Sequence, residues 1–228
     1  MKNHGKLFVV EGNICSGKTT LVKKLKADLG NNCVVFIEPS LNNPYLDKFY
    51  KDPKKYALTM QIYMLNVRFK NYVAALELVK SGKTVILDRS IFSDIVFAEQ
   101  NFNDGNISKD GYKYYLNIRS SLMKRLPIPT LFINLNVCAK VCHDRILRLR
   151  CIECEKTIPL TYLNGLDMCY KTLFRYLRGV ANVVDTDWDK FDNYNDIYNA
   201  ITSAKKTDMS YDKKWTFIDY TFRELYFD

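Results

Sequence analysis

A glycine-rich segment near the start of the chain, residues 12–19 (Gly-Asn-Ile-Cys-Ser-Gly-Lys-Thr), has the spacing of a phosphate-binding loop. It follows an apolar run, residues 7–10, and precedes residues 21–27, whose apolar spacing suits a helix. In that setting the loop amides and the helix N-terminus face a phosphate chain. Lys18 would neutralise the β- and γ-phosphates, and the Thr19 hydroxyl would ligate Mg²⁺. The motif predicts binding of a nucleoside triphosphate; a glycine turn that binds nothing is the alternative.

Charged side chains follow two other predicted strands. Glu38 comes after the apolar run 33–37, where its carboxylate could accept a proton from an attacking hydroxyl. Asp88 ends the run 84–87 and could hold Mg²⁺ through water, and Arg89 could pair with phosphate oxygens or orient Glu38. Ligands of open α/β sheets bind at the carboxyl ends of the strands, so these positions favour an active site. A surface glutamate before a proline turn is the alternative for Glu38.

A second group of polar residues lies on predicted helices. Gln61 and Arg68 are seven residues apart, so they share one face of a long helix that is otherwise apolar. An amide and a guanidinium there suit the reading of a base, and an arginine at the surface is the alternative. Asp94 opens the next helix, where it could be only a favourable first-turn charge. Guanidiniums within 145–150 could clamp a transferring phosphoryl group or form a solvated basic face.

Buried apolar runs alternate with helical patterns along the chain. We expect strands near 7–10, 33–37, 84–87, 130–135 and 182–185, and helices near 21–27, 46–50, 53–81, 93–101, 109–124, 138–150, 158–178 and 194–204. This alternation predicts an α/β fold with a five-stranded parallel sheet flanked by helices on both faces. We expect one domain, residues 1–204, followed by an aromatic-rich extension, 205–228, of unknown role.

The amino-acid composition of the chain limits the kinds of partner that we expect it to bind. The 228 residues carry a formal net charge of +9, but the basic residues are spread along the chain, which favours a solvated surface and no nucleic-acid partner. No apolar run approaches the roughly 20 residues that span a bilayer. The predicted first strand begins too early to leave room for a signal peptide. We therefore expect a soluble, cytoplasmic protein with no membrane partner.

The cysteines raise the question of zinc. Seven cysteines without a secretion signal indicate free thiols in a reducing compartment. One cluster could hold the metal: Cys138, Cys142, His143, Cys151 and Cys154. Because a single C-x-x-C lacks a clean second pair, we predict that no zinc is bound.

Taken together, these stretches resemble the deoxyribonucleoside kinase family, which includes deoxycytidine, deoxyguanosine and deoxyadenosine kinases and the insect multisubstrate enzyme. The similar stretches run in order over most of the chain: 11–20, 38–39, 50–57, 61–63, 88–93 and 158–163. The resemblance implies a P-loop kinase fold with a helical lid at about 145–157, and a homodimer. It implies transfer of the ATP γ-phosphate, with Mg²⁺, to the 5′-hydroxyl of a small-molecule deoxynucleoside in nucleotide salvage.

The family's catalytic residues have counterparts here. Glu38 matches the general base for the 5′-hydroxyl, and Arg89 matches the arginine beside it. Lys18 is the lysine of the phosphate loop, and Asp88 stands with Thr19 where the family places an acidic residue near Mg²⁺. The nucleotide-binding set is then Gly12, Asn13, Ile14, Cys15, Ser16, Gly17, Lys18, Thr19, Thr20, Arg148 and Arg150.

The resemblance also assigns the nucleoside side. Gln61 matches the glutamine that bonds the base, and Tyr50 matches the tyrosine on the sugar 3′-hydroxyl. Glu155 matches the lid glutamate on the same hydroxyl, while Arg148 and Arg150 resemble the lid arginines. The stretch 148–155 departs from the family pattern by what looks like a one-residue insertion. The loop 39–50 is short, as in the bacterial deoxyadenosine and deoxyguanosine kinases.

Base preference depends on Arg68 and Asp94, which match the pair that reads the base in deoxycytidine and deoxyguanosine kinases. An ionised Asp94 can only accept hydrogen bonds, so it suits an exocyclic amine and opposes the thymine carbonyl. We therefore expect activity on deoxyadenosine, deoxyguanosine or deoxycytidine, with a lean towards purines, and poor activity on thymidine. Two other functions stay open: a thymidylate-like monophosphate kinase, and a catalytically silent structural homologue.

Overall fold

The computed structural model describes residues 4–38, 43–124, 126–149, 152–205 and 207. Its strands are β1 (Lys6–Gly12), β2 (Cys33–Phe36), β3 (Thr84–Asp88), β4 (Leu131–Asn136) and β5 (Val183–Asp187). They form one parallel sheet in the order β2-β3-β1-β4-β5, with Leu7 opposite Val85 and Phe8 opposite Leu131. The sheet therefore changes its direction of growth at β1, the strand that leads into the glycine motif. Ligands of such sheets bind at this kind of switch point.

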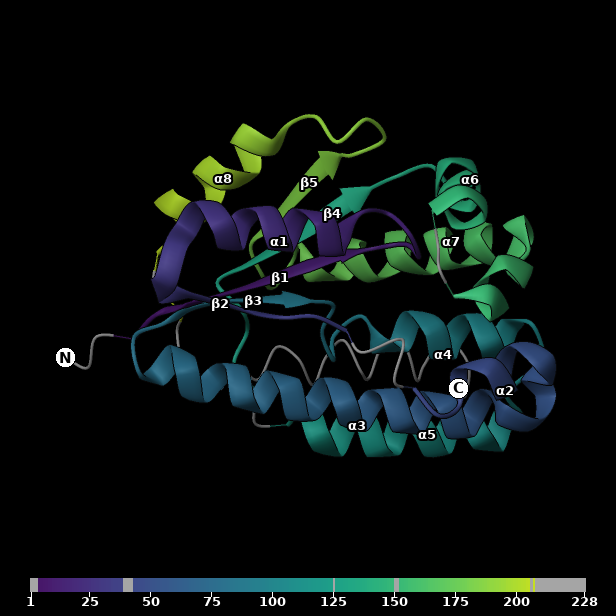
Figure 1. Cartoon of the computed structure of the whole chain (residues 1–228). Coiled ribbons are helices and arrows are strands. Elements are labelled where there is room, and N and C mark those ends of the chain that lie inside the picture. The colour runs from purple at the N-terminus through teal and green to yellow at the C-terminus, as the bar shows by residue number, and fades with distance from the viewer. Residues whose placement is uncertain (1–3, 39–42, 125, 150–151, 206, 208–228) are drawn as a thin grey trace.

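Helices cover both faces of the sheet, as predicted. Figure 1 shows α1 (Lys18–Leu29) and α8 (Tyr194–Ser203) on one side, and α3 (Pro53–Lys80), α4 (Asp94–Asn103) and α5 (Lys109–Met123) on the other. α2 (Leu46–Lys51) contacts α3, and α7 (Leu160–Leu177) contacts both α4 and α6 (Ala139–Leu149). Two 3₁₀ turns complete the order, η1 (Gly30–Asn32) and η2 (Glu153–Thr157).

The central strand shows why this fold forms. Leu7, Phe8, Val9 and Val10 are all fully buried, because helices cover β1 on both faces. Burying one such side chain contributes about 1.5–3 kcal/mol. A continuous apolar run, rather than an alternating one, is therefore the expected sequence of this strand.

The long helix α3 positions the predicted base-reading residues. Asp52 caps its N-terminus by accepting a hydrogen bond from the Lys55 amide at 3.2 Å, and Pro53 occupies the first turn. The helix then runs for 28 residues. Gln61 and Arg68 lie on its buried face, about 10 Å apart along the axis at 1.5 Å per residue.

The described part of the predicted extension lies far from the carboxyl edge of the sheet. Of residues 205–228, the structure describes only Lys205 and Thr207. The Thr207 hydroxyl accepts a hydrogen bond from the Leu7 amide at 2.7 Å, and the Thr207 amide donates to the Gly5 carbonyl at 3.2 Å. Thr207 therefore lies beside the beginning of β1. Over the described residues, no helix is both long and apolar enough to span a membrane.

Candidate active site

The phosphate loop connects β1 to α1, as its sequence predicts. Cys15 and Gly17 adopt left-handed backbone angles, with φ of 59° and 98°. A side chain at Gly17 would be strained twice, because an added Cβ would also lie 2.6 Å from the Phe191 ring. Lys18 curls back over the loop and donates to the carbonyl of Asn13 at 2.7 Å and to that of Gly12 at 3.2 Å.

The ammonium group of Lys18 is buried, and within the described part of the chain its hydrogen-bond acceptors are the carbonyls of Gly12 and Asn13 and the Ser16 hydroxyl, all of them neutral. Burial, reinforced by the positive charge of Arg89, lowers the pKa of Lys18 to about 8. A phosphate entering the loop would supply the missing negative charge. The loop is therefore electrostatically prepared for an anion.

Thr19, in the first turn of α1, lies beside Asp88, the last residue of β3. The Thr19 hydroxyl donates to Asp88 Oδ2 at 2.5 Å. Burial raises the pKa of Asp88, and the Lys18 charge and the Thr19 hydrogen bond only partly offset that increase. Hydroxyl and carboxylate oxygens are the ligands that Mg²⁺ prefers, so this pair fits the metal that the motif implies.

Arg145, on α6, supports the phosphate loop. This role differs from the two that the sequence suggested for the guanidiniums of 145–150, a phosphoryl clamp and a solvated basic face. Its guanidinium donates to the Ser16 carbonyl at 3.1 Å and to the carbonyls of Trp188 at 3.2 Å and Asp189 at 2.7 Å. It also lies over the Phe191 ring, 4.2 Å from the centroid. This buried arginine therefore ties the phosphate loop to the segment after β5. The spacing of residues on α6 gave no signal for this role, because Arg145 and Arg148, three residues apart, lie on neighbouring parts of the same helix side.

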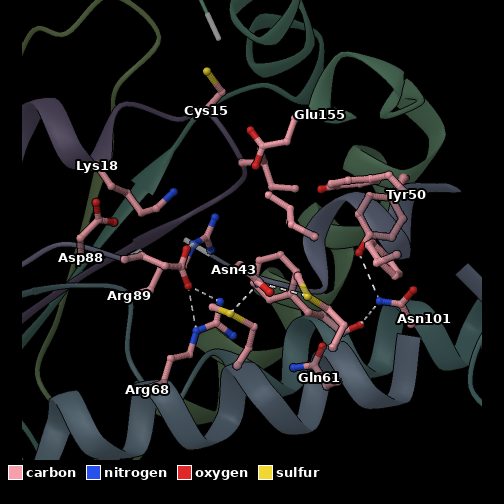
Figure 2. Close-up of a pocket in the computed structure, with 18 of the residues that line it drawn as sticks. Cys15, Lys18, Asn43, Tyr50, Gln61, Arg68, Asp88, Arg89, Asn101 and Glu155 are labelled. Carbon is pink, nitrogen blue, oxygen red and sulfur yellow. Dashed lines mark hydrogen bonds and ion pairs between the residues drawn. The ribbon is translucent and has the colours of Figure 1, made fainter. Parts of the chain in front are cut away.

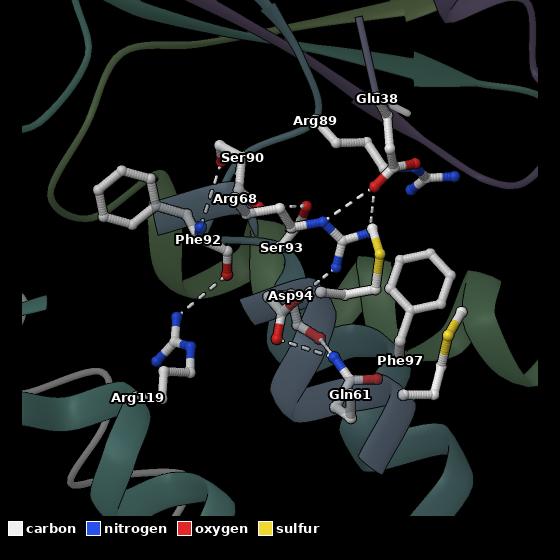
Figure 3. Close-up of polar contacts among 12 residues, drawn as sticks. Glu38, Gln61, Arg68, Arg89, Ser90, Phe92, Ser93, Asp94, Phe97 and Arg119 are labelled. Atoms are coloured by element: carbon white, nitrogen blue, oxygen red, sulfur yellow. Dashed lines mark hydrogen bonds and ion pairs between the residues drawn. The ribbon is translucent and has the colours of Figure 1, made fainter. Parts of the chain in front are cut away.

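Glu38 lies between two arginines, as Figure 3 shows. Arg68 donates to Glu38 Oε1 from Nε at 3.0 Å and from Nη2 at 2.5 Å, while Arg89 Nε lies 3.0 Å from Oε2. Burial alone would raise the pKa of Glu38, but the charges of Arg68 and Arg89 hold it below its ordinary value. The carboxylate is therefore ionised, oriented and only partly exposed.

Asp94 is the second anion held by Arg68. Arg68 Nη1 donates to Asp94 Oδ1, and Gln61 Nε2 donates to Asp94 Oδ2 at 2.8 Å and to the Asp94 carbonyl at 3.0 Å. Figure 3 shows Arg68 bridging the two carboxylates. The predicted base-reading residues therefore form one network that extends to Glu38.

Arg89 is held in an unusual conformation. Its backbone is left-handed, with φ of 67°, which costs on the order of 1–3 kcal/mol in a residue with a side chain. The fully buried Glu11 accepts hydrogen bonds from the Ser90 amide at 3.0 Å and the Ser90 hydroxyl at 2.8 Å, and so pins the next residue. Arg89 Nη1 also donates to the hydroxyl of Tyr170. Neither Glu11 nor Tyr170 stands out in the sequence, because each acts through a neighbour.

One cavity joins the phosphate loop to this network (Figure 2). The phosphate loop, the segments that follow β2 and β3, and the helices α2, α3, α4, η2 and α7 contribute to its lining. The lining residues are Ile14, Cys15, Lys18, Thr19, Glu38, Asn43, Leu46, Phe49, Tyr50, Met60, Gln61, Met64, Arg68, Asp88, Arg89, Phe97, Asn101, Glu155 and Tyr162. Tyr50 and Glu155 lie on the side of the cavity away from Arg68 in Figure 2. The cavity therefore brings together most of the residues that the sequence singled out.

Some expected residues lie elsewhere. Arg148 is exposed in the last turn of α6 and does not line the cavity, and Thr20 is exposed on α1. Asp94 is fully buried behind Gln61 and Arg68 instead of lining the cavity. Arg150 and Cys151 lie outside the described residues. Within the described ranges, no three His, Cys, Asp or Glu residues are grouped to hold a metal.

Comparison with known proteins agrees with this geometry. The deoxynucleoside kinase family model matches residues 8–208. The deoxyguanosine kinase of Dictyostelium discoideum is 43% identical over 205 residues, which cover 89% of this chain and 71% of that protein. The deoxyadenosine kinase of the same organism is 33% identical over 187 residues, which cover 82% and 74%.

A solved structure shows the same fold. The deoxyadenosine kinase of M. mycoides with bound dATP superimposes with a TM-score of 0.75 at 26% sequence identity, covering 87% of this chain and 100% of that chain. Its phosphate-loop kinase fold confirms the predicted fold class. The match over most of the sequence, together with this fold and the cavity beside the phosphate loop, establishes that the chain belongs to the deoxynucleoside kinase family.

Proposed function

We propose that this chain transfers the γ-phosphoryl group of ATP to the 5′-hydroxyl of a deoxynucleoside. The observation that carries this proposal is that Lys18, Glu38 and Gln61 line the same cavity. A phosphate-binding cation, a proton acceptor and a polar amide for a base are thus available to one bound nucleoside. The relatives named deoxyguanosine and deoxyadenosine kinase support the same reaction.

In this mechanism Glu38 takes the proton of the 5′-hydroxyl. Arg68 occupies Oε1 through two N–H groups, whereas Arg89 contacts Oε2 through Nε, so Oε2 keeps a lone pair for the hydroxyl. The loop amides and Lys18 hold the phosphates and stabilise charge on the transferring group. Thr19 and Asp88 would hold Mg²⁺, which when bound neutralises charge on the phosphate oxygens.

The other end of the cavity would hold the nucleoside. Tyr50 and Glu155 line it where the sugar 3′-hydroxyl is proposed to bind, and Gln61 with Arg68 would meet the base. We propose deoxyadenosine, deoxyguanosine or deoxycytidine as acceptors, in preference to thymidine, with a lean towards purines. The purine names of the similar relatives support that lean.

Several further features belong to the same proposal. Residues 1–204 would form the kinase domain, with a lid at about 145–157 in which Arg148 and Arg150 close on the phosphates. The exposed position of Arg148 leaves it room to move towards the cavity when a nucleotide binds. We also propose a cytoplasmic homodimer that acts in nucleotide salvage.

The acceptor class can be tested directly. The protein is incubated with Mg²⁺ and ATP labelled at the γ-position, and either deoxynucleosides or deoxynucleoside 5′-monophosphates are supplied. We expect label in 5′-monophosphates formed from the nucleosides. Transfer only to monophosphates would instead support a thymidylate-like kinase, and transfer to neither would support a silent homologue.

A further inference from the structure

The buried carboxylate of Asp94 has one partner that does not belong to the cavity. Tyr115, on α5, donates its hydroxyl to Asp94 Oδ2 at 2.7 Å. Both side chains are fully buried, and neither lines the cavity. This contact therefore reaches Asp94 from behind, on the side opposite to a bound nucleoside.

Tyr115 is itself rigidly placed. The side chain of Ser108 caps α5 by accepting a hydrogen bond from the Gly111 amide at 3.1 Å. The ring of Tyr115 stacks on that of Tyr112 with centroids 6.2 Å apart. One turn further along α5, the buried Arg119 donates to the Phe92 carbonyl at 3.1 Å. The hydroxyl is thus held by a packed helix and not by a mobile loop.

The contact fixes the plane of the Asp94 carboxylate. Rotation about the last bond of an aspartate side chain is soft, so one partner alone would not define it. Here Oδ1 receives Arg68 and Oδ2 receives both Gln61 and Tyr115. Oδ2 therefore has both lone pairs occupied, and each oxygen has an assigned partner.

The orientation of Gln61 follows from that arrangement. Its amide nitrogen contacts Asp94 Oδ2 at 2.8 Å and the Asp94 carbonyl at 3.0 Å. Both of those atoms can only accept, so both N–H groups of Gln61 are used. The group that Gln61 can offer to a base in the cavity is its carbonyl oxygen, an acceptor. Beside it lie the remaining donors of Arg68.

We propose that Tyr115 is a positioning residue for base selection in this kinase, an inference that rests on the function proposed above. By holding Asp94, its hydroxyl keeps Gln61 as an acceptor next to the Arg68 donor. That pattern complements a base edge with one donor beside one acceptor. Replacing an exocyclic amine by a carbonyl reverses the order of donor and acceptor along such an edge, so a fixed pair distinguishes the two edges, whichever of them it prefers.

The test compares acceptors that differ only in this replacement: deoxyadenosine with deoxyinosine, and deoxycytidine with deoxyuridine. The kcat/KM ratio within each pair is measured for the wild-type protein, Tyr115→Phe and Tyr72→Phe. Tyr72 is a matched control, because it is fully buried and its hydroxyl donates to the Pro127 carbonyl at 2.7 Å, away from Asp94. The ratio does not depend on the folded fraction, which affects both acceptors equally.

We expect Tyr115→Phe to bring the ratio about tenfold closer to one, corresponding to about 1.4 kcal/mol of lost discrimination, mainly through KM, with kcat within about threefold. Tyr72→Phe should leave the ratio within about twofold. In an Asp94→Ala background, Tyr115→Phe should have no further effect, because the hydroxyl acts through Asp94. A wild-type ratio retained in Tyr115→Phe, or an equal change of the ratio in Tyr72→Phe, would overturn the role of Tyr115. A wild-type protein that phosphorylates no deoxynucleoside would overturn the proposed function itself.

Discussion

The phosphate loop and the Arg68 network occupy one cavity but are built in different ways. The loop is a single short segment between β1 and α1, and its shape comes from backbone angles at residues such as Gly17. The network assembles side chains from separate segments: Glu38 after β2, Arg68 on α3, Asp94 on α4 and Tyr115 on α5. One is local and made by the main chain, whereas the other is long-range and made by ion pairs.

This difference sets how each region responds to change. In the loop, Lys18 supplies the positive charge and donates to neutral carbonyl and hydroxyl oxygens, so its loss removes a function without breaking a hydrogen-bonded ion pair. In the network, Arg68 is shared by two carboxylates, so its loss leaves both without a main partner. Breaking a buried ion pair from one side costs about 3–5 kcal/mol. The following substitutions test whether the phosphate loop and the Arg68 network respond to the loss of a side chain in these two different ways.

The largest effect is expected for Lys18→Ala. The transferring phosphoryl group would lose its main fixed cation, so kcat/KM should fall by about 10³-fold or more. Lys24→Ala is the matched control, because Lys24 lies on the same helix but is exposed, with its ammonium 3.1 Å from Asp28 and 4.1 Å from the centroid of the Tyr194 ring. Steady-state rates with saturating nucleoside provide the measurement. Equal activity of the two variants would contradict the role given to Lys18.

Glu38→Gln should come next. The amide keeps the shape of the side chain but cannot take a proton, so turnover should fall by about 10²–10⁴-fold with ATP binding unchanged. Single-turnover kinetics and equilibrium ATP binding test the two halves of this prediction. Glu77→Gln, on the exposed part of α3, should behave as wild type. Retention of more than a tenth of the wild-type turnover would exclude Glu38 as the base.

The network is tested by Arg68→Met alone and together with Asp94→Ala. The single variant leaves Asp94 buried without its arginine, so it should melt at a lower temperature than the double variant. The double variant should gain activity on thymidine relative to deoxyadenosine by about 10- to 100-fold, because it removes one polar mismatch of about 1–3 kcal/mol. Thermal melts and kcat/KM values measure these effects. An unchanged base preference would show that this pair does not read the base.

The smallest expected effect concerns pH. Because burial lowers the pKa of Lys18 to about 8, the ligand-free protein loses this charge as the pH rises through that value. ATP binds the protonated form more tightly, so its binding should take up protons above about pH 8. The Kd for ATP should therefore rise several-fold between pH 7 and pH 9.5. Calorimetry in buffers of different ionisation enthalpy detects the proton uptake, and a pH-independent Kd would contradict the prediction.

The same contrast explains how much the sequence could predict. The phosphate loop was predictable with its strand and helix, because its function depends on local spacing, and the apolar runs also predicted the five parallel strands. Gln61 and Arg68 were suggested by their shared helix face. Glu11 and Tyr115 were missed, because their partners are distant in sequence and a buried tyrosine or glutamate has no local signature. Arg145 was grouped with a possible phosphoryl clamp or a solvated basic face, and its contacts with distant carbonyls gave no local signal. The buried position of Asp94 behind Gln61 was also beyond a reading of spacing alone.

The central claim is that the cavity selects a deoxynucleoside by its base and phosphorylates its 5′-hydroxyl. The most direct measurement is a competition assay in which deoxyadenosine, deoxyguanosine, deoxycytidine and thymidine at equal concentration share γ-labelled ATP, with the products separated and identified. We predict labelled 5′-monophosphates of the first three, purines foremost, with thymidine lower by at least about tenfold. Thymidine monophosphate as the main product would contradict the account of base selection.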